Sequence, residues 1–437
     1  MGWRQYYILI VSSMGQIIGA GLSTAAGIII PMIMLLKSPG LSTAMQGFIG
    51  AAGLVGIAVG SVIIGRISDR YGYLLWFRIS PALIVAGSLS IYFFPDIPVL
   101  LAGLFTIGLG VGGGYALDSS YISELLPDKW KLFMVGVAKG SCALGFLGVA
   151  VVCYFILKSN PNPEIWNCLI LTITTLGVLT LLMRIRWAES PHWLIVKGRK
   201  ADAEKAAEFF FGKGVTVSDA GPVSQKESVP IASMFRGKNL RNVVLTGIPW
   251  ACEGVGVYGI GVFLPQLIMA LGLAPSHETG IGSVIESLEF TSIVNFFILP
   301  GFAIGLYFVR KMNHIKMLVD GFIVCTLGLI MLLSAYILKL PVWVSVLGFV
   351  IFEVFLNAGP HLVTYVLPAQ IFPVEVRGTG SGIAAMTGKI GAVTGVFLMP
   401  VILKTGGMVL VLSISIAVMI AGAMIAVIFG KNIKNVN

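Results

Sequence analysis

Charged residues are scarce in this chain of 437 residues. Asp, Glu, Lys and Arg make up 11% of it, whereas soluble domains contain about 25% of these residues. Hydrophobic residues account for 57% of the chain. This composition excludes an ordinary soluble protein and is typical of a protein embedded in a lipid bilayer.

Motifs of the common enzyme classes are also missing. The sequence contains no G-x-x-x-x-G-K-[ST] phosphate loop, no H-E-x-x-H zinc motif and no Ser, His and Asp in a catalytic motif context. Its five cysteines fall in apolar stretches without the spacing of metal ligands. We therefore expect no enzymatic activity, no cofactor and no bound metal.

Long apolar stretches are abundant instead. A hydrocarbon core of about 30 Å needs roughly 20 helical residues to cross it. Twelve stretches satisfy this requirement, and they are residues 6–36, 44–65, 74–94, 99–121, 132–157, 164–187, 242–271, 284–309, 316–338, 341–366, 378–403 and 407–429. The sequence therefore predicts an all-α integral membrane protein with twelve transmembrane helices, and stretches this long exclude a barrel.

The net charge of +10 is explained by where the basic residues lie, without a nucleic-acid partner. Most of the 29 Lys and Arg residues are assigned to the N-terminus, the even-numbered connections between spans or the C-terminus. Because basic residues gather on the cytoplasmic side of a membrane, both termini are expected in the cytoplasm and the protein in the cell (inner) membrane. Two basic residues, Lys139 and Lys389, are assigned to the interior of spans.

The longest polar stretch separates six spans from six. We expect an N-terminal six-helix bundle over 1–187, a cytoplasmic linker over 188–241 and a C-terminal six-helix bundle over 242–437. Within the linker, KADAEKAAEFFFGKG (200–214) has the apolar spacing of a short amphipathic helix lying on the cytoplasmic surface. Two halves about a central pathway are the usual architecture of secondary transporters.

The segment GRISDRYG (65–72), between the second and third spans, fits the G-x-x-x-D-R-x-G signature of the major facilitator superfamily. The whole chain resembles that superfamily, which implies two six-helix halves that move by alternating access. The resemblance implies a cytoplasmic gating latch, in which Gly65 permits close helix packing, Asp69 accepts hydrogen bonds from a helix N-terminus and Arg70 anchors the cytoplasmic face. Further gating residues are expected at the cytoplasmic ends of the spans, and they are Glu124, Lys131 and Arg377.

Three longer segments narrow the subgroup. ESPHWLIVKGR (189–199) resembles the ESP-R-WL segment of sugar porters, with His192 where Arg is usual. GVGGGYALDSSYISELLP (110–127) is similar to the fourth span of phosphate-proton symporters. Residues 357–395 are similar to spans 10 and 11 of the same symporters and of aromatic-acid and organic-ion porters. The resemblance covers the full chain and implies a secondary transporter.

The two lysines inside spans indicate the sign of the solute. A charge at the bilayer centre costs from about 3 to more than 10 kcal/mol unless it is paired or hydrated. The position that matches Lys389 is basic in organic-anion and aromatic-acid porters and tends to be acidic in organic-cation porters, so the resemblance implies an anionic substrate. Lys139 lies eight residues after Lys131, at a substrate-binding position of sugar porters, and two amines in one cavity attract an anion. The matching positions also imply further substrate-binding residues, and they are Tyr115, Trp250, Tyr258, Asn357 and His361.

Asp118, Glu253 and Glu353 are the deepest acids in the predicted spans. The spans hold more acids than lysines, so at least one deep acid is expected to bind a proton, and Asp118 or Glu253 is the expected carrier in proton-coupled symport. The first span contains no acid, unlike that of many proton-coupled relatives, which leaves facilitated diffusion open. A second interpretation pairs Lys139 with Asp118 and Lys389 with Glu353, as locks between the halves.

Other functions remain open at this point. A neutral-sugar transporter is favoured by the segment 189–199, and an organic-cation transporter by the excess of buried acid. A non-transporting sensor of the same fold is a fourth possibility. The expected partners are a small anionic solute, a proton and the lipid bilayer, and the chain is expected to act as a monomer.

Overall fold

The computed structural model is helical wherever it has regular structure in the residues that it describes. Those residues are 3–36, 41–126, 128–212, 231–272, 280–372 and 377–431. The described chain forms two compact units, each assembled from several segments of the sequence. The predicted all-α class is therefore confirmed, while the predicted division at 188–241 stays a prediction.

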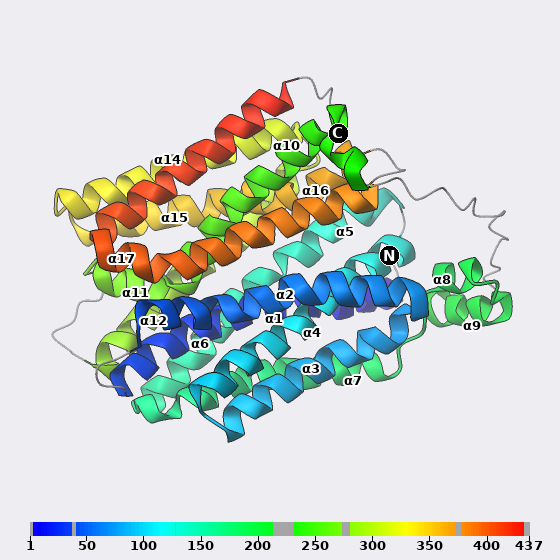
Figure 1. The fold of residues 1–437 in the computed structure, drawn as a ribbon, viewed down its shortest axis with the longest axis horizontal. Helices are drawn as coiled ribbons and strands as arrows, with labels where there is room; N and C mark the ends of the chain where they lie inside the picture. Colours follow the sequence, from blue (N-terminus) through cyan, green and yellow to red (C-terminus); the bar gives the residue numbers. More distant parts are fainter. Residues whose placement is uncertain are drawn as a thin grey trace. The chain divides into compact units, whose positions relative to one another are not determined.

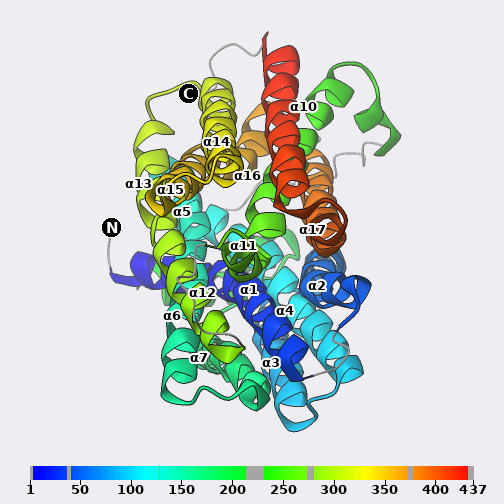
Figure 2. The ribbon, with the colours of Figure 1, turned by 90° about the vertical axis from the view of Figure 1, so that its left-hand side faces the viewer.

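The first unit consists of residues 1–19, 55–142 and 170–228. Its helices are the first half of α1 (Trp3–Leu36), the second half of α2 (Thr43–Tyr71), α3 (Tyr73–Phe93), α4 (Ile97–Leu125), α5 (Asp128–Gly140), α7 (Leu171–Ile185), α8 (Pro191–Val196) and α9 (Lys200–Phe211). Within this unit α3 packs against both α4 and α7, as Figures 1 and 2 show.

The second unit consists of residues 20–54, 143–169 and 229–437. Besides the remaining halves of α1 and α2, it contains α6 (Cys142–Ser159), η1 (Pro163–Ile170), η2 (Ile231–Phe235), α10 (Gly237–Gly254), η3 (Val255–Ile260), α11 (Leu264–Ala270), α12 (Ile281–Phe296), α13 (Ile298–Phe308), α14 (His314–Ile337), α15 (Val342–Ala358), α16 (Pro360–Ile371) and α17 (Arg377–Gly430). In this unit α17 packs along α10 and α14, and α14 packs along α15.

Eleven helical stretches of the described chain are long and apolar enough to cross a membrane. The last of them, Thr379–Gly430, has 52 residues, more than twice the roughly 20 that one crossing needs. It contains one residue with a left-handed backbone, Gly407, at φ 61° and ψ −162°. This kink separates the predicted spans 378–403 and 407–429, so the prediction of twelve spans and the eleven helical stretches agree.

Small residues allow close packing of α3 and α4. A Cβ atom added to Gly87 of α3 would lie 2.8 Å from the carbonyl oxygen of Gly103 in α4, closer than real Cβ atoms come. Lipid chains are as apolar as leucine, so membrane helices associate mainly through such close van der Waals packing. A glycine at this position is therefore part of what holds the first unit together.

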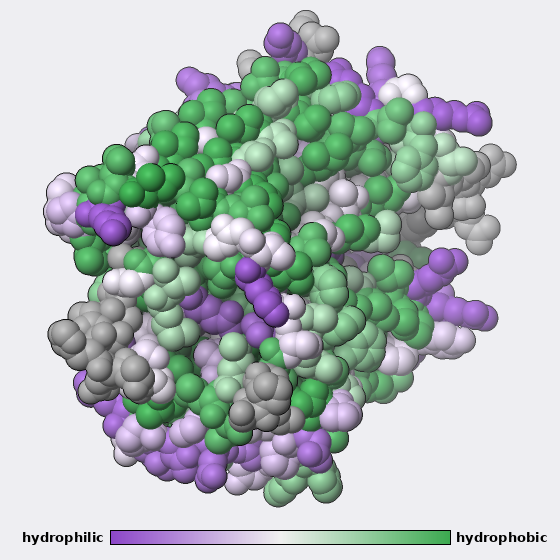
Figure 3. Space-filling model, turned by 60° about the vertical axis from the view of Figure 1, so that its left-hand side comes forward, coloured by the Kyte–Doolittle hydropathy of each residue, from purple (hydrophilic) through white to green (hydrophobic). Residues whose placement is uncertain are grey.

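The outward-facing side chains of the spans are largely hydrophobic. Figure 3 shows one face of the molecule, on which hydrophobic residues cover most of the area. Exposed side chains include Val62, Ile63, Leu182 and Leu327 in three predicted spans. A surface of this kind would be an aggregation hazard in water and is what a hydrocarbon solvent requires.

The helix predicted in the linker is present as α9, but its apolar side is covered by protein. Ala203, Ala206, Ala207 and Phe210 are buried, and the Phe210 ring lies 5.4 Å from that of Trp187, at the end of the sixth predicted span. Its apolar face therefore packs within the first unit, and its position on the cytoplasmic surface stays a prediction.

We expect Gly87→Leu to lower the stability of the protein by about 1 to 3 kcal/mol, because the added side chain overpacks the contact between α3 and α4. The measurement is the thermal unfolding temperature of purified protein in detergent. Gly148→Leu is the matched control, since nothing lies within 4 Å of a Cβ added there. Equal unfolding temperatures for the two variants would contradict this account of the contact.

Candidate functional site

A buried ion pair occupies the interior of the first unit. Arg184 of α7 and Asp118 of α4 are both almost completely buried, and Nη2 of Arg184 lies 2.6 Å from Oδ1 of Asp118. The same nitrogen donates to the carbonyl oxygen of Val11 in α1 at 3.3 Å, and Nη1 donates to that of Phe77 in α3 at 3.2 Å. The guanidinium also lies 3.7 Å from the centroid of the Phe77 ring. One side chain therefore joins four helices.

Arg184 was not predicted from the sequence as a site residue, because of where it lies in its span. It is close to the C-terminal end of predicted span 164–187, where a long basic side chain ordinarily reaches the headgroup region. The sequence MRIRW (183–187) places Arg184 between apolar residues, and this was the available signal. It does not reveal that the Arg184 side chain turns inward. The second interpretation above is corrected on this point, because the structure pairs Asp118 with Arg184 rather than with Lys139.

Two glycines of α1 let this helix approach α4. A Cβ added to Gly15 would overlap Oδ2 of Asp118, and one added to Gly19 would overlap the hydroxyl of Tyr115. The first predicted span therefore provides space for polar groups of α4. At this level of the first unit the acid comes from α4.

The second unit contains a lysine held by an aromatic ring. Nζ of Lys389 in α17 lies 3.4 Å from the hydroxyl of Tyr258 and 4.7 Å from the centroid of its ring. Tyr258 belongs to η3, a π-helical turn, and such turns are frequent at functional sites. The glycine before the lysine, Gly388, leaves space for the indole of Trp250 in α10, which in turn lies 6.2 Å from the ring of Tyr365. A cation and three aromatic rings thus come from adjoining helices.

A chain of polar side chains lies beside them in the same unit. Nδ2 of Asn357 donates to Oε2 of Glu353 at 3.2 Å, and Oδ1 of Asn357 lies 2.8 Å from Nδ1 of His361. Nε2 of His361 lies 3.5 Å from Oε1 of Glu253. All four residues are at most 6% exposed. Four residues predicted for two roles, substrate binding and proton coupling, therefore form one connected network.

The hydrogen bonds described for Glu353 and Lys389 are with other residues, whereas the interpretation of the two as a lock between the halves pairs them with each other. Glu353 accepts its hydrogen bond from Asn357, and the amine of Lys389 is held by Tyr258. Lys139 is buried, at 6% exposed, and belongs to the first unit, whereas Lys389 belongs to the second. That both amines face one cavity stays a prediction.

The sugar-porter-like segment and the G-x-x-x-D-R-x-G loop meet at the start of α3. Oε1 of Glu189 accepts the backbone N–H of Tyr73 at 2.9 Å, and Oε2 accepts that of Leu74 at 3.1 Å. The residue before α3 is Gly72, at φ 105°, which offers no side chain to cap the helix. A carboxylate is favourable at a helix N-terminus, so Glu189 acts as the cap. The sequence analysis named this segment but not this role.

The expected gating residues are described in part. Gly65 lies against Ala116, with 3.4 Å between an added Cβ and the Ala116 Cβ, and the exposed Arg70 lies over the ring of Tyr71. Glu124 accepts a hydrogen bond from the hydroxyl of Ser190. The remaining gating side chains lie outside the described residues, and they are Asp69, Lys131 and Arg377.

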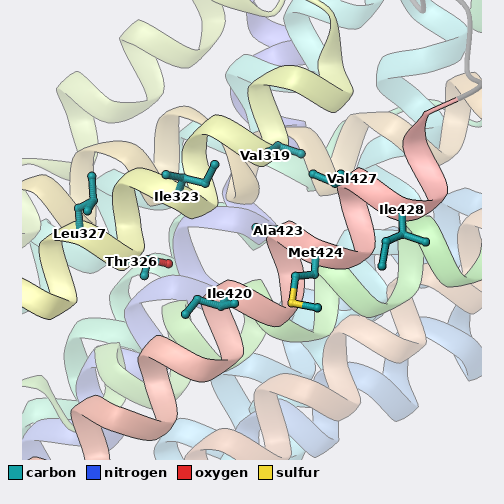
Figure 4. Close-up of a pocket in the computed structure, with 9 residues that line it drawn as sticks. All are labelled: Val319, Ile323, Thr326, Leu327, Ile420, Ala423, Met424, Val427 and Ile428. Atoms are coloured by element: carbon teal, nitrogen blue, oxygen red, sulfur yellow. The ribbon is translucent and has the colours of Figure 1, made fainter.

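An apolar groove between α14 and α17 is a poor candidate for a solute site. Its volume is about 530 Å³, and Figure 4 shows its lining, which includes Ile323, Leu327, Ile420 and Met424. Thr326 supplies the only polar side chain among the residues that line it. A groove of this composition suits hydrocarbon rather than an ion.

The apolar helices and the charges held in the interior are those of a multi-pass membrane protein, and the family match identifies it as a transporter of the secondary type, not an enzyme. The chain belongs to the sugar (and other) transporter family, whose family model matches residues 9–437. The resemblance to the major facilitator superfamily and the fold predicted from it are confirmed. In a structural comparison, the xylose transporter XylE from Escherichia coli, in a partially occluded inward-open conformation, matches with a TM-score of 0.82 at 19% identity, over 100% of this chain and 99% of that one.

Several named transporters are similar in sequence to most of this chain. The inner membrane metabolite transport protein YgcS of Escherichia coli is 26% identical, over 92% of this chain and 86% of that protein. The niacin transporter NiaP of Acinetobacter baylyi is 26% identical, over 83% and 79%. The repressible high-affinity phosphate permease of Neurospora crassa is 26% identical, over 78% and 66%. The chain is thus similar to proteins named for different solutes.

We expect Asp118→Asn to lower stability by about 3 to 5 kcal/mol, because it leaves the guanidinium of Arg184 buried without a counter-charge. Thermal unfolding in detergent measures the effect. Asp202→Asn is the matched control, since Asp202 pairs with Arg199 at 2.7 Å on the surface, where such pairs contribute about 0 to 1 kcal/mol. An Asp118 variant as stable as the Asp202 variant would refute a structural role for the buried pair.

Proposed function

We propose that this protein transports a small anionic solute across the cell membrane by alternating access, in symport with a proton. The observation that carries the proposal is Lys389, an ammonium group held over Tyr258 in a helix long and apolar enough to span a membrane. In surroundings of low dielectric constant an ammonium attracts a carboxylate or phosphate oxygen much more strongly than in water. A neutral sugar would gain little from such a group, and an organic cation would be repelled.

Aromatic rings on the helices next to Lys389 favour a flat anion. The Tyr258 ring lies beside the amine, Trp250 packs against the neighbouring Gly388, and Tyr365 lies beside Trp250. Aromatic groups pair favourably with one another. A solute with a carboxylate on an aromatic ring would use both the amine and these faces. Nicotinate, the ionised form of niacin, has this chemistry, and one relative is named for niacin. Another relative is named for phosphate, which is also a small anion. Nicotinate is therefore the first solute to test.

A neutral-sugar transporter is the second candidate. The family is that of sugar (and other) transporters, and the segment beginning at Glu189 resembles the corresponding segment of sugar porters. The two candidates differ in their dependence on Lys389, because hydroxyl groups can be bound by neutral side chains and a carboxylate benefits from a charge.

We expect Lys389→Gln to weaken nicotinate uptake by about tenfold or more in apparent affinity, since a hydrogen bond to a charged group contributes about 1.5 to 3 kcal/mol. The measurement is uptake of radiolabelled nicotinate, phosphate and xylose into proteoliposomes. Lys311→Gln is the matched control, because Lys311 also lies over a tyrosine, 3.9 Å from the centroid of the Tyr307 ring, but is exposed. Xylose uptake that is unaffected by Lys389→Gln, without uptake of either anion, would replace the anion proposal with the sugar one.

We propose in addition that both termini lie in the cytoplasm, as the distribution of basic residues favours. Green fluorescent protein fused after residue 437 is then expected to fluoresce, and alkaline phosphatase fused at the same residue to be inactive, in a bacterial host. The reverse pattern would contradict this topology.

A further inference from the structure

The chain of four polar side chains in the second unit has a direction that its hydrogen bonds define. Nδ2 of Asn357 donates to two oxygens of Glu353, the backbone carbonyl at 2.8 Å and Oε2 at 3.2 Å. Only an NH₂ group can donate to both, so the other end of the amide is its oxygen. That oxygen lies 2.8 Å from Nδ1 of His361, and Nδ1 must therefore carry a hydrogen.

This orientation of the Asn357 amide leaves one nitrogen of His361 for proton exchange. With Nδ1 fixed as a donor, Nε2 is the nitrogen that gains or loses a proton. Nε2 lies 3.5 Å from Oε1 of Glu253, an ion-pair distance outside hydrogen-bond geometry, so a proton bound by either group changes the charge that the other experiences. The pair is neutral overall with that proton and carries one negative charge without it.

Groups on the surrounding helices define the electrostatic setting of this pair. The Phe302 ring of α13 lies 5.3 Å from the ring of His361 and supplies no charge. The titratable groups on elements packed against the network include Lys238, Arg241 and Cys252 of α10, Tyr258 of η3, Glu286 and Glu289 of α12, Tyr307 of α13, His314, Lys316, Asp320, Cys325 and Tyr336 of α14, Tyr365 of α16, and Lys389 and Lys404 of α17. Among the basic groups, Lys389 follows Gly388, which packs against Gly254 beside Glu253. The exposed Glu289 accepts a hydrogen bond from Tyr154.

Glu253 and Lys389 lie at the same level of two packed helices. A Cβ added to Gly254, the neighbour of Glu253, would lie 2.7 Å from the carbonyl oxygen of Gly388, the neighbour of Lys389. An anion at Lys389 would therefore sense whether Glu253 and His361 carry a negative charge. Protonation of the pair removes that charge and favours anion binding, and by linkage a bound anion favours protonation to the same extent.

Asp118 is less suited to this task. Its carboxylate lies 2.6 Å from a guanidinium nitrogen, and a guanidinium keeps its charge in proteins. A proton on Asp118 would leave that buried cation without its counter-charge. The two acids that the sequence analysis could not separate are thus distinguished by the partners the fold gives them.

We propose that Glu253 and His361 form the proton-binding site of this transporter, with Asn357 as a positioning residue and Glu353 as the group that orients its amide. During one transport cycle the pair takes up one proton on the side where the anion binds and releases it on the opposite side. This inference rests on the proposed function, because it assigns the coupling site of the anion symporter.

The test compares Glu253→Gln with Glu289→Gln, a matched substitution on a carboxylate outside the network. In proteoliposomes containing a pH-sensitive dye, Glu253→Gln should lower nicotinate-driven proton entry by about tenfold or more. This size is typical of the coupling between two binding sites in one protein. Exchange of labelled for unlabelled nicotinate, which needs no net proton movement, should continue in the same variant. Glu289→Gln should behave like the unchanged protein in both assays. Proton entry that survives Glu253→Gln, or is lost instead in Glu289→Gln, would overturn the assignment.

A second measurement needs no solute and so separates the two proposals. Infrared difference spectra of purified protein between acidic and alkaline buffer should contain the carbonyl band of a protonated buried carboxyl. The band should disappear in Glu253→Gln, persist in Glu289→Gln, and change its midpoint pH in Asn357→Leu, which a purely structural role for Asn357 would not cause. If nicotinate, phosphate and xylose are all untransported but the band behaves in this way, the anion proposal fails and the proton site stands. A band unchanged in Glu253→Gln would refute the proton site whatever the solute.

Discussion

A charge inside a membrane has no bulk water to solvate it, and this constraint governs how both units of the chain are built. Each buried charge must be held by protein groups or lose its charge to a proton, since leaving it bare costs several kcal/mol or more. The first unit uses the former solution. Arg184 places its guanidinium against a carboxylate, two backbone carbonyls and an aromatic face taken from α1, α3 and α4, while its Nε has no hydrogen-bond partner among the described residues.

In the proposed mechanism the second unit uses the other solution. Its acids at Glu253 and Glu353 lie beside an imidazole and an amide rather than a guanidinium, and the proposal assigns the change of charge to Glu253 and His361. Its amine at Lys389 is held by the hydroxyl and ring of Tyr258, which stabilise an ammonium without neutralising it. A carrier needs groups of this kind, because a site whose charges are permanently compensated has little free energy left with which to bind a solute or couple it to an ion.

The resemblance to other transporters and the physical account of the chain are complementary. The family match fixes the architecture and the mode of action, while relatives at about a quarter identity are named for niacin, phosphate and unspecified metabolites. Binding specificity within a shared fold comes from a few side chains, so the solute has to be argued from those side chains. In the proposed function, the lysine in α17 and the Tyr258 ring beside it favour an anion over a sugar.

The sequence by itself determined the class of the protein. The length and number of the apolar stretches, the scarcity of charge and the loop motif at 65–72 were enough for an all-α transporter, because hydrocarbon admits few backbone structures and leaves a strong compositional signature. The second-unit residues Glu253 and His361 were also named from the sequence, since an ionisable group in an apolar span is conspicuous, and Asn357 was named from the family resemblance. Their separate roles were not, because they follow from which atoms meet.

Only the tertiary structure decided which charges are paired. Arg184 is 66 residues from Asp118 along the chain, and Glu253 is 108 from His361, so neither contact leaves a local pattern in the sequence. Whether an arginine near the end of a span turns toward lipid headgroups or toward an acid on another helix depends on the rotation and packing of both helices. Apolar periodicity does not fix that rotation in spans that are hydrophobic on all sides, and the close contacts made by glycines such as Gly15 do.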